Sequence, residues 1–177
     1  MEFVFTKNFY GLNVLELMQR TWVNSLQLDE FKKIKAETRR LQVLQQINQT
    51  AMVFVCDVGP CLRVSWSNRI ESITPGTLSD GLTGTGYVLG TQSVSTDYPL
   101  QLSERKSCEN VTWAHLALSI EALEVFNSTT GENYQRIRWV GRTDYGSKEH
   151  AQRDAADTLQ SMLRWEMLLV APALNLP

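Results

Sequence analysis

The chain contains few cysteines and no long apolar run, and each shortage excludes a class of protein. Its three cysteines, Cys56, Cys61 and Cys108, are too few and too uneven for the disulfide framework of a small secreted domain. No apolar run approaches the roughly 18 residues that cross a bilayer as a helix, so we expect no membrane span. The first residues do not follow the pattern of a signal peptide, and we therefore expect a cytoplasmic protein.

The two histidines and the glycines form no known catalytic or cofactor pattern. His115 and His150 lie far apart in the sequence, whereas a zinc site needs about four ligands at suitable spacing. The segment 81–86 is rich in glycine but lacks the GxGxxG spacing of a dinucleotide site. Cys56 and Cys61 flank a predicted turn, where they are read as small buried hydrophobes, with a disulfide as the alternative. We therefore expect a protein that is not an enzyme and holds no metal or cofactor.

The composition is that of a folded domain. Of the 177 residues, 43% are hydrophobic and 20% are charged, and five Trp, five Tyr and six Phe argue against disorder. A chain of this length can bury a hydrophobic core without disulfides or metals. The formal net charge of −2 gives no general attraction to nucleic acid or to anionic membranes.

Apolar periodicity in the first third of the chain changes from helical spacing to strict alternation. The long helix is expected because its apolar residues follow one stripe between good helix formers. The hairpin is expected because alternating residues flank a Gly-Pro turn. The predicted elements are a short edge strand at 2–6, helices at 11–24 and 28–49, and hairpin strands at 51–57 and 61–67.

The middle of the chain, residues 74–110, is rich in Gly, Ser and Thr, which predicts a long loop that contains one short strand at 86–89. The next segment, 114–126, fits a strand by its alternation and a helix by its apolar spacing. A polar turn with Gly131 and the alternating run 134–140 follow it, and they favour the strand as the first half of a hairpin.

A C-terminal helix is predicted after Ser147, whose hydroxyl can accept a backbone N–H of the first turn. Ala151 and Ala155 lie on one face of this helix and would let it approach a sheet closely. Its end, residues 163–170, is apolar on all sides, so we expect it to be buried or to form an interface. Pro172 marks the limit of the helix, because proline cannot continue it in normal geometry.

These elements define an α+β fold in which an antiparallel sheet packs against N-terminal helices and a C-terminal helix. We expect an N-terminal helical segment at 1–50 and a sheet region closed by the C-terminal helix at 51–177. The two parts are short enough to share one hydrophobic core, so they are predicted to form a single compact domain.

Basic residues gather between positions 134 and 153. Arg136 and Arg138 would project from the same strand face, and Lys148 would stand at a helix N-terminus, where backbone N–H groups suit a phosphate. The alternative interpretation is an ordinary solvated face of the sheet. The predicted nucleic-acid-binding residues are Arg136, Arg138, Arg142, Lys148 and Arg153.

Residues 134–163 resemble the C-terminal part of a double-stranded-RNA-binding domain, chiefly through the segment GSKEHAQRDAADTL at 146–159. In that family a glycine precedes a Ser-Lys-Lys helix start, and alanines pack the helix against a three-stranded sheet. The resemblance implies that Lys148 contacts RNA phosphates. Glu149 and Gln152 stand where the family has further lysines.

The basic cluster and this resemblance predict a non-enzymatic accessory protein that binds double-stranded or structured RNA. The alternative is a structural or adaptor subunit of a larger assembly, with protein partners or self-association through residues 163–170, because exposed apolar surface commonly marks an interface. Neither interpretation involves a membrane.

Overall fold

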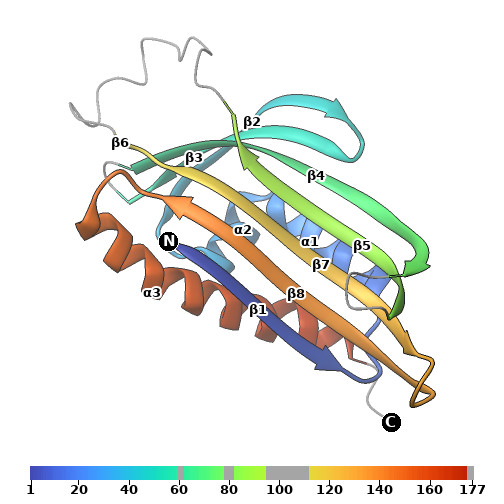
Figure 1. Cartoon of the computed structure of the whole chain (residues 1–177). Helices are drawn as coiled ribbons and strands as arrows, with labels where there is room; N and C mark the ends of the chain where they lie inside the picture. The colour runs from blue at the N-terminus through green and yellow to red at the C-terminus, as the bar shows by residue number, and fades with distance from the viewer. Residues whose placement is uncertain (60–61, 78–81, 95–111, 175–177) are drawn as a thin grey trace.

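A computed structural model describes residues 1–59, 62–77, 82–94 and 112–174 as one large sheet with helices packed against it (Figure 1). The strands follow the spatial order β1-β8-β7-β5-β4-β3-β2 with antiparallel neighbours, and the short β6 pairs in parallel with β4. The predicted α+β class, with an antiparallel sheet, N-terminal helices and a C-terminal helix, is confirmed. The strands are β1 (Glu2–Phe9), β2 (Thr38–Asn48), β3 (Ala51–Val58), β4 (Leu62–Thr77), β5 (Thr83–Ser93), β6 (Thr112–Trp113), β7 (His115–Asn127) and β8 (Glu132–Asp144). The helices are α1 (Val14–Ser25), α2 (Leu28–Ile34), α3 (Lys148–Trp165), the π-helical turn η2 (Glu166–Val170) and the 3₁₀ turn η3 (Ala171–Ala173).

Side-chain caps define where two of the helices begin. The Asn13 side chain accepts a hydrogen bond from the backbone N–H of Glu16 at 3.1 Å and starts α1. Ser147 accepts the N–H of His150 at 3.2 Å and starts α3, which confirms the predicted cap. The helix predicted at 11–24 is confirmed as α1.

Residues 28–49 do not form the single helix that their apolar stripe predicts. Helix α2 ends at Ile34, and β2 then pairs with β3, with Leu41 opposite Cys56. The register slips at three places in β2, and each slip inserts an extra residue that interrupts the alternation of a regular strand. The apolar residues therefore acquire helical spacing, although the backbone is extended. The slips fall between Thr38 and Arg40, between Val43 and Gln45, and between Gln46 and Asn48.

Most of the described part of 74–110 is strand, so the prediction of a long loop is wrong there. β4 extends to Thr77, and β5 covers Thr83–Ser93, while residues 95–111 lie outside the described part of the chain. The glycine content that suggested a loop has a local cause in β5. A Cβ atom at Gly86 would lie only 2.1 Å from the carbonyl oxygen of Ala122, so only glycine fits this approach to β7.

Segment 114–126 is strand β7, which resolves the alternative between strand and helix. The β7–β8 hairpin turns through Gly131, whose φ of 72° is a conformation that glycine adopts readily. The Asn127 side chain accepts the backbone N–H of Thr129 at 3.0 Å and so fixes the start of the turn. The predicted hairpin is confirmed, and its second strand, β8, is longer than the expected run 134–140.

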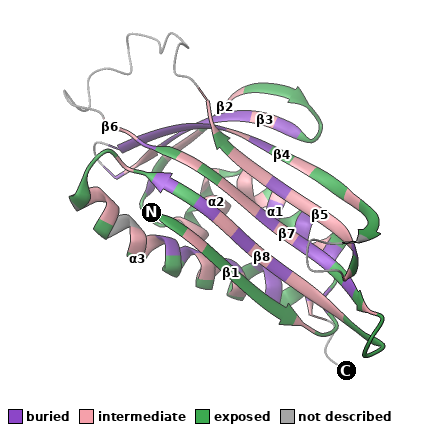
Figure 2. Cartoon of the chain, viewed as in Figure 1, coloured by how far each residue is buried: buried purple, intermediate pink, exposed green. Residues whose placement is uncertain are grey.

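One face of the sheet, here called the inner face, carries the main core (Figure 2). The strand register places Leu89, Ile120 and Trp139 side by side across β5, β7 and β8. These residues pack against Leu17 and Met18 of α1 in one buried cluster. Helices α1 and α3 therefore share the inner face, and any space beneath α3 lies between it and the sheet.

Phe3 of β1 lies over Gly141 of β8, its partner across the edge of the sheet. A Cβ atom at Gly141 would come within 2.3 Å of Cζ of Phe3, so Gly141→Ala must displace the ring. We expect the free energy of unfolding to fall by about 1–2 kcal/mol, measured by urea denaturation.

Gly90→Ala is the matched control, because its Cβ atom would meet no heavy atom closer than 3.8 Å. This control should be neutral or slightly stabilising, since glycine weakens a strand. Equal effects of the two substitutions would contradict the packing of Phe3 on Gly141.

Candidate functional site

A groove of about 410 Å³ lies between β1 and β8 on one side and α3 with the start of η2 on the other. Figure 1 shows α3 running alongside β1 at this edge of the sheet. Register brings the two strands' side chains to the same place, since Phe5 pairs with Trp139 and Lys7 with Ile137. Only three of the lining residues are polar, and the groove is mainly apolar. The lining residues are Phe5, Thr6, Lys7, Phe9, Ile137, Trp139, Leu159, Met162, Leu163, Trp165 and Glu166.

The inner wall of the groove is a pair of buried tryptophans. Trp139 of β8 and Trp165 of α3 meet edge to face, with ring centroids 5.3 Å apart and planes inclined by 66°. The indole N–H of Trp165 donates to Oγ1 of Thr21 at 3.3 Å, and this hydroxyl donates to the carbonyl oxygen of Leu17 at 2.8 Å. Both hydrogen bonds are buried, so the wall is fixed in orientation.

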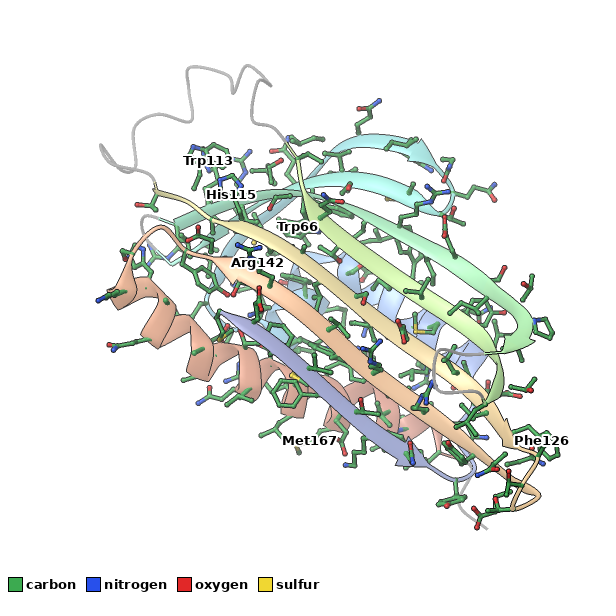
Figure 3. The ribbon with its side chains drawn as sticks, in the orientation of Figure 1. Trp66, Trp113, His115, Phe126, Arg142 and Met167 are labelled. Carbon is green, nitrogen blue, oxygen red and sulfur yellow. The ribbon has the colours of Figure 1, made fainter. Side chains whose placement is uncertain are left out.

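The outer wall of the groove is an exposed apolar row on α3. Leu159 and Leu163 are 51% and 62% exposed although they line the groove, and Met167 continues the row at 73% (Figure 3). Spacing of four residues places them on one side of the helix. The expectation that residues 163–170 are buried therefore holds for only part of the segment. Trp165 and Leu169 are buried inside the chain itself, while Leu163 and Met167 remain open to solvent.

An ionic cluster fixes the far side of α3 to α2. Asp157 lies 2.9 Å from Nζ of Lys35 and 3.7 Å from the guanidinium of Arg164. Arg164 also donates to the carbonyl oxygen of Ile34 at 3.2 Å. These contacts hold α3 against α2, whereas its other side faces β1 across the groove.

The two charged residues of the groove lie together. Lys7 of β1 forms an ion pair with Glu166, the first residue of η2. The Lys7 ammonium also lies 5.2 Å from the centroid of the Phe9 ring, close enough for a cation–π contact. The groove thus combines a mainly apolar lining with one charged pair.

The predicted nucleic-acid-binding residues belong to two elements, β8 and α3. Arg136, Arg138 and Arg142 alternate with the inward-facing residues of β8, so they lie on the face opposite α3. Figure 3 labels Arg142 among them. Two of them are paired with acids from neighbouring strands. Arg138 lies 3.6 Å from Glu121, and Arg142 lies 3.8 Å from Glu2. Lys148 and Arg153, by contrast, belong to α3.

The other candidate residues provide no second site. His115 is exposed at the start of β7, and His150 lies in the first turn of α3. In the described ranges, no three His, Cys, Asp or Glu side chains come close enough to share a metal ion. Cys56 is a buried free thiol, and burial raises its pKa to about 12, which makes it a poor nucleophile. Cys61 lies outside the described residues.

Two human structures share this fold at low sequence identity. The lipid transfer and protein localization domain of human StarD13 (DLC2) matches with a TM-score of 0.54 and 11% identity, over 97% of this chain and 76% of that one. Human STARD10 matches with a TM-score of 0.52 and 12% identity, over 94% of this chain and 66% of that one. At these identities the likeness concerns the fold alone. No protein-family model matches the sequence, and no curated protein matches it.

The prediction of an RNA-binding accessory protein with an RNA partner is wrong. The chain has the fold of a domain described in StarD13 as a lipid transfer and protein localization domain, and two of its three β8 arginines are paired with acids. Within 163–170, the segment of the adaptor alternative, Trp165 and Leu169 are buried in the chain, and the apolar residues that stay exposed are Leu163, Met167 and Leu168. In the part of the chain that the structure describes, no helix has the length and apolar character needed to cross a bilayer.

The hydrogen bond between Trp165 and Thr21 can be tested by a double-mutant cycle. Thr21→Val leaves the buried indole N–H without its acceptor, so we expect it to lower the free energy of unfolding by about 1–3 kcal/mol. Trp165→Phe removes the donor, and the double variant should lose less than the sum of the two single variants. Strictly additive losses in urea denaturation would show that the pair does not interact.

The buried thiol of Cys56 predicts a pH dependence of stability. The unfolded chain releases this proton near the ordinary pKa of 9.0, whereas the folded chain holds it to about 12. The stabilisation that comes from the protonated thiol is complete below the unfolded-state pKa of 9.0. Above that pKa the free energy of unfolding should fall by about 1.4 kcal/mol per pH unit.

Cys56→Ala removes this ionisation and leaves the other titrating groups in place. Urea denaturation at about pH 8 and about pH 10 should therefore give a steeper loss for the natural chain than for the variant. Parallel losses in the two proteins would mean that the thiol ionises as easily in the folded state as in the unfolded state.

Proposed function

We propose that this chain binds a small apolar molecule in the groove between β1, β8 and α3, and that it acts by binding rather than by catalysis. The observation that carries the proposal is the groove itself, with its apolar lining and its fixed tryptophan wall. Its volume of about 410 Å³ falls within the roughly 300–1,000 Å³ of ordinary small-molecule sites. Lys7 and Glu166 are its charged lining residues, and they suit orientation of a ligand.

The exposure of the apolar row supports an occupant in the groove. Leu159 and Leu163 leave about half of their side-chain surface in water, which is unfavourable for a monomeric protein. Covering that surface with an apolar ligand would contribute about 1 kcal/mol for each leucine. The walls need no rearrangement to accept the ligand, because Trp139 and Trp165 are already held in place.

The fold likeness supports the same proposal. In StarD13 the matching domain carries the description of a lipid transfer and protein localization domain, and nearly all of this chain takes part in the match. For this chain we propose an apolar ligand, and the size of that ligand is set by the volume of the groove.

Leu163→Asp tests the groove directly. It places a charge on the apolar wall, so the dissociation constant for the neutral dye Nile red should rise by about tenfold or more. Dye fluorescence at equilibrium gives the dissociation constants of the natural chain and the variant.

Leu168→Asp is the matched control, because Leu168 is also an exposed leucine of the same helical segment but does not line the groove. It should change the dissociation constant less than about twofold. Absence of saturable dye binding to the natural chain, or an equal loss in both variants, would refute the proposed site.

A further inference from the structure

The charged pair of the groove identifies the chemical class of its ligand. We infer that the groove takes a single-chain amphiphile with a carboxylate head, and that Lys7 binds this head in place of Glu166. The inference rests on the proposed function, because it concerns the ligand of the same groove. The observations behind the inference are that Lys7 is the one cation among the lining residues and that Glu166 is the acid paired with it.

Lys7 is placed to hold a head group while a chain lies along the apolar lining. Its neighbours two positions away on β1, Phe5 and Phe9, also line the groove, so the ammonium stands within an aromatic surface. The cation–π contact with Phe9 is a second anchor that does not depend on Glu166. The ammonium can therefore stay at the groove when its acidic partner leaves.

Glu166 is the partner that can be exchanged. The Lys7 and Glu166 side chains are 58% and 35% exposed, and an ion pair with this exposure is weak and screened by salt. Glu166 begins the π-helical turn η2 and can turn towards water when it releases Lys7. A carboxylate attached to a buried chain would compete well, because the chain holds it beside the ammonium.

The size of the groove favours one chain. A volume of about 410 Å³ lies near the lower end of the range for small-molecule sites. A lipid with two acyl chains would need considerably more space than the walls enclose. The inferred ligand is thus a long-chain carboxylic acid in its ionised form.

The test compares three ligands with the same chain and different heads: dodecanoate, dodecanol and dodecylammonium, each below its micelle concentration. Displacement of Nile red from the natural chain gives the three affinities. Dodecanoate should bind about tenfold more tightly than dodecanol, as expected for one charge-assisted contact. This preference should shrink as salt is added.

Three variants then locate the head. Lys7→Met should weaken dodecanoate binding about tenfold and leave dodecanol within about twofold, while Lys7→Arg should retain the preference. Glu166→Gln should strengthen dodecanoate binding, because the competing carboxylate is gone. Lys7 is exposed on an edge strand, so these variants should fold, and circular dichroism checks that they do.

Each outcome decides between the two proposals. Equal affinities for dodecanoate and dodecanol, or a preference for dodecylammonium, would overturn the carboxylate inference and leave the apolar groove standing. An unchanged preference in Lys7→Met would place the head elsewhere and overturn the role of Lys7. Failure of all three ligands and of the dye would overturn the proposed function and this inference together.

Discussion

The contact between Trp139 and Trp165 is the point on which the architecture depends. It joins the last long strand of the sheet to the C-terminal helix, and the Trp165 indole N–H extends the connection to Thr21 of α1. On its other side α3 is tied to α2 through Asp157 and Arg164. Since α3 is fixed at these places, the space between it and β1 stays open, and that space is the groove.

Elements with a regular side-chain period could be predicted from the sequence. The strict alternation of Ile137 and Trp139 with arginines identified β8, and Ser147 identified the start of α3. Segment β2 could not be predicted, because three register slips gave an extended chain the apolar spacing of a helix. The spacing of apolar residues indicates the backbone conformation only where the hydrogen-bond ladder between two strands is unbroken. A β-bulge depends on the partner strand, and the local sequence does not identify that partner.

The groove escaped prediction for a different reason. Its walls come from β1, β8 and α3, and residues such as Phe5 and Met162 look like ordinary core residues when each segment is considered alone. The basic residues led to a wrong prediction of RNA binding, because alternation along β8 assigns Arg138 to a face of the sheet but does not identify its neighbours on that face. Glu121 of β7, which pairs with it, becomes visible only in the register. The spacing of Leu159 and Leu163 was the signal available in the sequence, but only the structure shows that both remain exposed.

The pairing of β1 with β8 has a consequence for how the protein is made. The amino group of Met1 donates to the carbonyl oxygen of Thr143 at 2.7 Å, between residues 142 positions apart. A ribosome therefore releases β1 long before the strand that completes its hydrogen bonds, and closing so large a loop is slow. Until then Phe3 and Phe5 belong to an unpaired apolar segment of the kind that chaperones recognise. The nascent chain acquires its groove only when its first and last strands meet.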